Sequence, residues 1–545
     1  MYKCPQCGAE MKFDPDRQKL VCGFCGREEE AGAEAGGEKQ AAPKMRPTYS
    51  AHVFTCPDCG AELLSTDETV ATFCSYCGGS VLFASRIEEE DCPDYVIPFK
   101  VTKEECEKAY RRTLKKALFA PSSMKQDTQI ERFRGIYMPY WIYSFEQDDR
   151  YRVKGRQSRR RGDYVYTKHY RLESHLTASC RGLSYDASAT FADNLSGAIA
   201  PFDIHEGKEF EPAYLSGFYA DKGNVESYVY SDQALQTAGQ YVASQAVRNS
   251  VYRKYNVDES DMADAFRPRK TEEKLGMFPV WFLGCRSHDG SRISYAVVNG
   301  QTGRVAADLP IDLKKYLLGS LILAVPIFFL LNLFLTLTPT KALIFAIVLA
   351  LFCLFVSNRQ CNRIYTRENQ LDDEGLQSTA KEGRRWRRKT KTTESGSGFG
   401  SSLLRMLLIF AVMTLSMSAM AMLLSTGLFG SAGGSMILAF VWFIVVAKLI
   451  MGTTKKKPAR RRAKQEIYAA PMQEKWKNLY KPAAAIVIAL AILILRPVSD
   501  LYYYIGAAVS LACVIWSFFD IIKEHNQLTT RKLPQLEKRG GDENA

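Results

Sequence analysis

Four Cys-x-x-Cys pairs near the N-terminus constrain this chain more than any other feature. Each pair is followed by a glycine, which allows the tight turn that directs backbone amides toward the sulfurs. Four thiolates match tetrahedral zinc, with disulfides or redox Cys-x-x-Cys pairs as the alternative. A four-cysteine site leaves no open coordination position, so we expect two structural Zn²⁺ ions without a catalytic role. The pairs form two sets of equal spacing, Cys4-x2-Cys7-x14-Cys22-x2-Cys25 and Cys56-x2-Cys59-x14-Cys74-x2-Cys77.

Long apolar runs dominate the chain from Tyr316 onward. Each is about long enough to cross ~30 Å of hydrocarbon at ~1.5 Å per residue, although one of them is short. Buried helices of a large soluble domain are the alternative, which the clustering and the near-absence of charge disfavour. The sequence therefore predicts a polytopic, all-α transmembrane region of about six helices, at 316–337, 341–357, 403–424, 435–451, 482–497 and 501–522.

The loops between these runs predict the orientation. Segments 358–400 and 452–481 each contain ten Lys and Arg residues, whereas the opposite loops contain only Lys341 and Arg496. The excess of basic residues in cytoplasmic loops places both termini in the cytoplasm of a multi-pass plasma-membrane protein. The cysteine sets agree, because thiolates persist in a reducing compartment. The N-terminus has no signal-peptide pattern.

The charge is divided unevenly along the chain, and this bears on the partners. The net charge of +13 separates into −7 for residues 1–92, +3 for 93–312 and +17 for 313–545. The basic membrane part favours contact with anionic lipid headgroups. The cysteine-rich part is acidic, which makes nucleic acid a poor partner. Proteins gain most of their affinity for nucleic acids by neutralising phosphates with basic residues. We therefore expect the zinc ribbons to dock cytoplasmic or membrane proteins.

Composition divides the chain into five segments of a multidomain protein. Within the middle segment, Thr102-x-x-Glu105 predicts a helix start and Ser231 predicts another. Asp289-Gly290 and Asn299-Gly300 predict hairpin turns. Two similar runs, GIYMPYWI and GMFPVWF, suggest two related halves. The predicted segments are zinc ribbon 1 (1–27), a flexible linker (28–51), zinc ribbon 2 (52–92), a cytoplasmic α+β domain (93–312) and the all-α transmembrane region (313–545).

No pattern of catalytic residues is present in the sequence. It has six histidines but no His-Glu-x-x-His, no phosphate-binding loop and no Gly-x-Ser-x-Gly elbow. We therefore expect a protein that is not an enzyme. No Asp or Glu lies in the middle of a predicted span, which disfavours an ion-coupled transporter. A basic cluster from Arg156 to Arg161 lies beside Tyr164 and Tyr166; we interpret it as a solvated turn, with a membrane-facing or partner-facing role as the alternative.

Several segments together resemble a known family. These are CPQCGAEMKFDPDRQKLVCGFCG, CPDCGAELLSTDETVATFCSYCG, VIPFKVTKEEC, GIYMPYWIY, FEPAYLSGFYADK and FPVWFLG with YAVVNGQTGRVAADLPID. In this order, over about residues 1–312, they resemble bacterial TFIIB-type zinc-ribbon-containing membrane proteins. The resemblance implies a cytoplasmic double zinc ribbon, an α+β domain and a membrane anchor, with the eight cysteines as ligands. It also implies a link to envelope-stress modules with phage-shock-type and SPFH-type proteins. The long multi-span region goes beyond the one or two spans expected for that family.

Our leading hypothesis is a non-enzymatic, membrane-anchored zinc-binding adaptor that recruits cytoplasmic proteins in envelope or membrane-stress maintenance. A membrane-bound nucleic-acid-binding regulator is the second hypothesis. A transporter or channel subunit with a zinc-ribbon regulatory domain is the third. The sequence is compatible with an oligomer and identifies neither the partner nor the exact number of spans.

Overall fold

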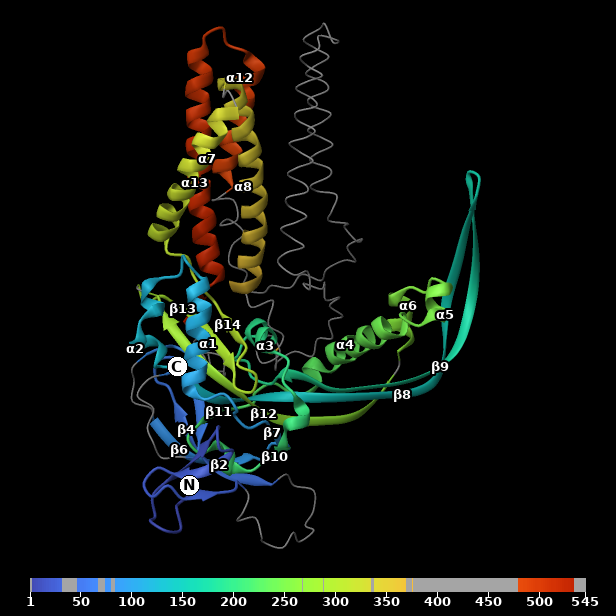
Figure 1. Cartoon of the computed structure of the whole chain (residues 1–545), viewed down its shortest axis with the longest axis vertical. Helices are drawn as coiled ribbons and strands as arrows, with labels where there is room; N and C mark the ends of the chain where they lie inside the picture. The colour runs from blue at the N-terminus through green and yellow to red at the C-terminus, as the bar shows by residue number, and fades with distance from the viewer. Residues whose placement is uncertain are drawn as a thin grey trace, which may run out of the picture. The chain divides into compact units, whose positions relative to one another are not determined.

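The structure is a computed structural model of the chain (Figure 1). It describes residues 2–31, 47–66, 74–79, 84–266, 268–287, 289–334, 338–368, 375 and 479–533. The chain divides into two compact units, one of residues 1–383 with 470–545 and one of residues 384–469. All described residues belong to the first unit. The predicted spans 403–424 and 435–451, and most of the predicted linker, lie outside the described residues.

The N-terminal residues form a small antiparallel sheet of three strands, β1 (Met11–Asp14), β2 (Lys19–Cys22) and β3 (Glu28–Glu29). Strand β3 lies inside the predicted linker 28–51, so this part of the linker is paired rather than free. The small sheet packs on the rest of the unit. The backbone amide of Phe13 donates to the carbonyl of Ser216 at 3.0 Å, and its ring lies 5.2 Å from that of Tyr214.

A sheet of twelve strands forms the centre of the described structure. Its main path runs β10-β7-β12-β8-β11-β5-β4-β6; β9 pairs with β8, and β13 pairs with β12, β14 and β15. The strands are β4 (Thr48–Thr55), β5 (Glu62–Ser65), β6 (Ala84–Asp91), β7 (Tyr95–Val96), β8 (Arg134–Arg161), β9 (Tyr164–Asp186), β10 (Lys208–Glu209), β11 (Tyr219–Asp221), β12 (Arg269–Arg286), β13 (Arg292–Asn299), β14 (Val305–Ala307) and β15 (Arg531–Lys532).

The second cysteine set belongs to this large sheet. Strand β5, inside the predicted ribbon 52–92, pairs with β11, and β11 pairs with β8. The predicted boundary at residue 92 is therefore crossed by backbone hydrogen bonds. This pairing could not be predicted from the sequence, because β11 has only three residues and pairs with a strand more than 150 positions away. The two similar aromatic runs lie in β8 and β12, which pair antiparallel with Met277 opposite Pro139.

Shorter helices cover the sheet: α1 (Lys103–Lys116), α2 (Asp127–Ile130), α3 (Asp193–Ile199), α4 (Tyr228–Ala246), α5 (Ser250–Lys254) and α6 (Glu259–Ala265), with 3-10 turns at Ser122–Lys125, Ile204–Glu206 and Pro212–Leu215. The capping box of Thr102 and Glu105 is confirmed at the start of α1. The predicted helix start at Ser231 is wrong. The N-cap of α4 is Ser227, four residues earlier, so Ser231 lies inside the helix and the buried Tyr230 extends its apolar face. The turn at Gly290 is confirmed, with φ of +68°.

Strands β8 and β9 extend beyond the rest of the sheet as a two-stranded arm, residues 147–178 (Figure 1). Pairing of β8 with β12 stops at Glu146. Helices α4, α5 and α6 accompany the first part of the arm, where Tyr151 and Val153 pack with Tyr252 and Met262. A two-stranded ribbon is only marginally stable alone, so this cluster supports the base of the arm.

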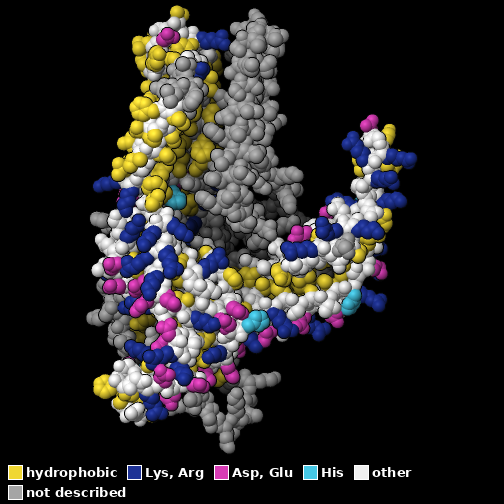
Figure 2. All heavy atoms as spheres, viewed as in Figure 1, with side chains coloured by type: hydrophobic (Ala, Val, Ile, Leu, Met, Phe, Trp, Pro, Cys, Tyr) yellow, Lys and Arg dark blue, Asp and Glu magenta, His cyan; other side chains and the backbone are white. Residues whose placement is uncertain are grey.

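Among the described residues, four apolar helices follow the sheet domain: α7 (Leu313–Phe334), α8 (Pro339–Glu368), α12 (Tyr480–Leu495) and α13 (Asp500–Leu528). Three of them, α7, α8 and α13, are long and apolar enough to cross a membrane, and α12 is shorter. These helices coincide with four of the six predicted spans. The apolar 18-residue window of α7 has no buried residue within the unit, and Figure 2 shows apolar side chains gathered along the helices. Such an apolar surface is typical of contact with lipid.

Helices α8, α12 and α13 pack through small side chains. Ala350, Cys353, Ala485 and Val514 form one buried cluster. The Ser510 hydroxyl donates to the carbonyl of Ala485 at 3.3 Å. Small residues let helix backbones approach closely, which is the usual means of association for helices in lipid.

Candidate metal centres and their link to the helices

The eight predicted ligands form two groups of four, as the sequence indicates. In each group all four sulfur atoms lie within 4.8 Å of one another. Neighbouring sulfurs are 3.5 Å apart for Cys4 and Cys25 and 3.7 Å apart for Cys59 and Cys74. A tetrahedron of Zn–S bonds of about 2.3 Å requires sulfurs roughly 3.8 Å apart. The spacing and the all-thiolate donor set therefore fit zinc in both groups.

The same backbone turn builds all four Cys-x-x-Cys knuckles. In each, the amide of the glycine after the second cysteine donates to the carbonyl of the first cysteine, at 2.8–3.0 Å. This turn needs a positive φ, and the four glycines have φ between +68° and +73°. In the first centre, the amides of Cys25 and Phe24 lower the pKa of the Cys22 thiol to about 6. Amides directed at sulfur therefore favour the thiolate that a metal binds.

The two centres differ in exposure. In the first centre Cys4 and Cys22 are buried, whereas Cys7 and Cys25 are exposed, and the Phe24 side chain is 85% exposed at the tip of its knuckle. In the second centre all four cysteines are buried. Phe24 and Tyr76 hold equivalent positions between the last two cysteines of their sets. The structure separates them, because Tyr76 is 1% exposed.

The side chain of Tyr76 enters the large sheet rather than its own knuckle. Its hydroxyl donates to the buried carboxylate of Asp221 on β11 at 2.7 Å, and its ring lies 5.3 Å from that of Phe282 on β12. Ser188 and Thr190 also donate to Asp221. Burial raises the pKa of the Asp221 carboxyl, and these three donors oppose that shift. This network holds the second centre against the sheet.

Strands β12 and β13 contact the Cys74–Cys77 knuckle of the second centre. Gly284 on β12 is required there, since a Cβ at this position would lie 2.5 Å from the carbonyl oxygen of Ser75. Arg286 donates to the carbonyl of Cys77 and lies 3.4 Å from Asp58. The hydroxyl of Tyr295 on β13 donates to the carbonyl of Tyr76 at 2.6 Å. The sequence did not indicate these contacts, because each joins residues about 200 positions apart.

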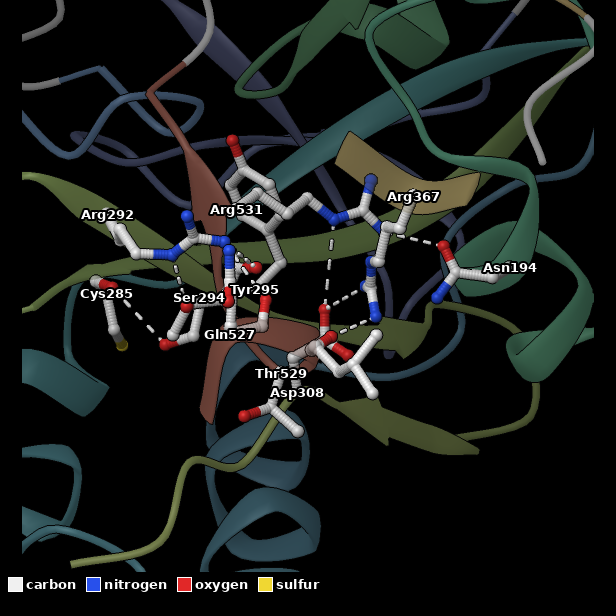
Figure 3. Close-up of polar contacts among 12 residues, drawn as sticks. Asn194, Cys285, Arg292, Ser294, Tyr295, Asp308, Arg367, Gln527, Thr529 and Arg531 are labelled. Atoms are coloured by element: carbon white, nitrogen blue, oxygen red, sulfur yellow. Dashed lines mark hydrogen bonds and ion pairs between the residues drawn. The ribbon is translucent and has the colours of Figure 1, made fainter. Parts of the chain in front are cut away.

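The opposite side of β13 is tied to the ends of two apolar helices (Figure 3). Arg292 donates to Glu368 at the end of α8 at 2.7 Å. It also donates to the carbonyl of Gln527 in the last turn of α13 at 3.0 Å and to that of Thr530 after α13 at 2.9 Å. Strand β15 continues from this point and pairs Arg531 with Ile293. We call this set of contacts the junction.

Asp308 forms the second half of the junction. It lies 3.2 Å from Arg367 of α8 and 3.9 Å from Arg531, whose guanidinium also donates to Asn194 at 2.5 Å. The same guanidinium lies 5.8 Å from the centre of the Tyr295 ring. Tyr295 therefore contacts the second metal centre through its hydroxyl and the junction through its ring. The chain carries a continuous set of contacts from the second centre to the helices.

A buried ion pair lies within the helices. Lys481 at the start of α12 pairs with Asp520 of α13 at 2.5 Å, and the two side chains are 10% and 7% exposed. The Lys481 ammonium also lies 4.4 Å from the ring of Trp516. The sequence missed this pair, because Asp520 is only two residues from the end of the predicted span 501–522 and no pattern joins it to Lys481.

Comparisons with known proteins give one relative. The chain is 29% identical over 320 residues to the uncharacterized protein YdjG of Bacillus subtilis (strain 168), which covers 58% of this chain and 91% of that protein. No family model matches the chain, and no solved structure matches it.

Proposed function

We propose that the chain is a membrane-anchored, zinc-binding adaptor that recruits proteins through its first metal centre and is not an enzyme. One observation carries the proposal: the first centre presents its knuckle to solvent with Phe24 exposed, whereas the second is buried in the sheet. A solvent-facing aromatic side chain on a rigid knuckle is suited to a small protein contact. The second centre is suited to holding the sheet together instead.

Three observations together support a cytoplasmic position for the sheet. Two described helix pairs, α7 with α8 and α12 with α13, each end in contact with β13 through the junction. Chain that leaves the sheet and returns to it crosses a membrane an even number of times. The basic loops and the thiolate ligands favour the cytoplasm for the sheet and both termini.

Charge supports a protein partner over nucleic acid. Residues 1–92 carry −7, and each four-thiolate zinc centre adds about −2. The resemblance to TFIIB-type zinc-ribbon membrane proteins directs attention to phage-shock-type and SPFH-type proteins as partners in envelope maintenance. The test of the proposal does not require knowing which of these two classes of protein binds.

The test is a crosslinking pull-down from native membranes with the full chain. Phe24→Ala removes the exposed ring without touching a ligand. Leu118→Ala is the matched control, since Leu118 is also largely exposed, at 72%, but lies after α1. The proposal expects a partner that is lost with Phe24→Ala and kept with Leu118→Ala. Equal recovery from both variants, or nucleic acid as the captured species, contradicts it.

A second candidate function, a channel or transporter subunit, is favoured by the Lys481–Asp520 pair. Ionisable side chains buried among membrane helices often mark ion or substrate paths. The test is ion flux through the reconstituted chain with and without Asp520→Asn. Flux that depends on Asp520 supports this function, and no flux in either sample contradicts it.

A further inference from the structure

The distal end of the arm, residues 156–170, is supported by other described elements only at its base. The last packed residues of the arm are Tyr151, Val153 and Leu172. Past them, residues around the end of α5 make further contacts: the Arg156 amide donates to the Tyr255 carbonyl at 2.6 Å, and the Gln157 side chain donates to the Lys254 carbonyl at 3.2 Å. The ring of Tyr170 lies 4.9 Å from that of Tyr255. Strand β8 runs 15 residues beyond its last pairing with β12, which is about 50 Å of extended chain. The arm thus presents its end far from the packed core.

At this end of the arm, basic side chains on β8 lie opposite apolar or aromatic side chains on β9. The last three cross-strand pairs before the turn each place an arginine opposite an apolar or aromatic residue: Arg159 with Tyr166, Arg160 with Val165, and Arg161 with Tyr164. Paired residues share one face of a ribbon and successive pairs change face. Both faces of the arm end therefore carry basic and apolar side chains together. Tyr164, Val165 and Tyr166 are 73%, 63% and 61% exposed.

Residues of the arm end and residues at and just after the end of α5 line a basic cleft. Its volume is about 1040 Å³, and five basic side chains but no acidic side chain line it. Asp258 neutralises one of them, Arg156, at 3.1 Å. Figure 2 shows Lys and Arg side chains gathered around the end of the arm. The basic residues of the cleft are Arg156, Arg159, Arg161, Lys168 and Lys254.

We propose that the end of the arm binds the surface of an anionic phospholipid bilayer, as a second membrane contact separate from the apolar helices. The arginines and Lys168 bind lipid phosphates, and Tyr164, Val165 and Tyr166 lie at the boundary between headgroups and acyl chains. Exposed aromatic and aliphatic side chains flanked by arginine are suited to this boundary. The proposal does not depend on the adaptor function.

The arrangement favours a bilayer over a nucleic acid. A groove or phosphate backbone is contacted by one basic face, whereas here both faces of the ribbon end carry an apolar residue beside an arginine. Such an end can enter an interface end-on, with phosphates around it on every side. Exposed tyrosines and a valine on a long two-stranded ribbon would otherwise favour aggregation.

The test measures amide hydrogen exchange of the full chain in lipid nanodiscs. One sample contains phosphatidylcholine alone and the other phosphatidylcholine mixed with phosphatidylglycerol. The proposal expects exchange at 159–166 to slow several-fold in the anionic discs, and less so at high salt because the contact is partly electrostatic. Unchanged exchange at 134–146, where β8 pairs with β12, shows that the fold is intact.

Three variants sharpen the result. Arg159→Gln with Arg160→Gln and Arg161→Gln should abolish the protection, and so should Tyr164→Ser with Val165→Ser and Tyr166→Ser. The control is Arg150→Gln with Arg152→Gln and Arg171→Gln, which removes the same charge from exposed positions nearer the base of the arm and should keep it. Equal protection in both discs overturns the proposal, and so does loss of the protection in the control variant. Protection that an oligonucleotide or inorganic phosphate produces without anionic lipid also overturns it.

Discussion

The hydroxyl of Tyr295 donates to the carbonyl of Tyr76 at 2.6 Å, across 219 positions of sequence. Tyr76 lies between two ligands of the second metal centre, and the Tyr295 ring lies beside Arg531 after the last helix. One side chain thus contacts both a metal-binding knuckle and the junction. Zinc binding at the second centre should therefore influence how firmly the helix ends are held.

Gly284→Ala should displace the second knuckle, because the added methyl group would lie 2.5 Å from the Ser75 carbonyl oxygen. Overpacking of this kind costs roughly 1–3 kcal/mol. Elemental analysis of the purified chain should show loss of one of its two zinc ions. Gly23→Ala is the control, since its added methyl group meets nothing within 4 Å. Full zinc content in Gly284→Ala contradicts the seating of the knuckle on β12.

Zinc should leave the two centres at different rates. Cys7 and Cys25 of the first centre are exposed, whereas all four ligands of the second are buried, so a chelator reaches the first centre sooner. A colorimetric zinc indicator added with excess chelator should report two phases of equal amplitude. Cys22→Ser should remove the fast phase alone. A single phase, or one zinc ion per chain, would count against two independent centres.

Arg292→Ala should weaken attachment of the helix ends to the sheet. The guanidinium donates to a carboxylate and two carbonyls, and hydrogen bonds to charged groups contribute about 2 kcal/mol each. Thermal unfolding in detergent should show a lower midpoint. Glu368→Ala combined with Arg292→Ala should cost less than the sum of the single changes, because the two side chains act as a pair. Strict additivity, or an equal loss in the exposed control Lys108→Ala, would contradict the junction.

Ala489→Leu should disrupt the packing of α12 with α8 and α13, since Ala489 is fully buried with Leu343 and Ala507. We expect a loss of about 1–3 kcal/mol, measured as reduced thermal stability in detergent. Val487→Leu on the same helix is the control, because Val487 is 65% exposed. Similar losses in both variants would mean that α12 does not pack as described.

Val498→Cys should react with an impermeant thiol reagent added outside intact cells. Val498 is fully exposed in the turn between α12 and α13, at the end of these helices away from the sheet (Figure 1). Cytoplasmic thiols are shielded from the reagent in intact cells, so the chain without the added cysteine gives the background labelling. Ser287→Cys, at the sheet, should gain no labelling. The reverse pattern would place the sheet and the metal centres outside the cell.

The sequence predicted the grouping of the eight cysteines, and the structure brings them together in two sets of four. The knuckle glycines and the capping box of α1 likewise depend on residues a few positions apart, and backbone geometry fixes such relationships. It did not predict how the second centre is seated. Asp221, Gly284 and Tyr295 bear no spacing relationship to the cysteines, and their roles arise from strand pairing between distant segments. The Lys481–Asp520 pair was missed for the same reason.

Three of the predicted spans coincide with helices that are long and apolar enough to cross a membrane, namely α7, α8 and α13. The predicted linker and ribbon boundaries were less accurate, because weakly apolar edge strands such as β3 look like linker in composition. Distance along the chain, rather than residue type, thus separates what could be predicted from what could not.

Strand β15 has a consequence for the order in which the protein is made. It pairs with Ile293 of β13, yet it is synthesised after the last helix, some 238 positions later than its partner. The ribosome therefore releases a nearly complete sheet, and part of the edge of β13 stays unpaired until α13 has formed and its end has reached the sheet. An open edge is the part of a sheet most prone to wrong pairing. A chain in which α13 failed to reach the sheet would carry this open edge on the strand that contacts the second metal centre.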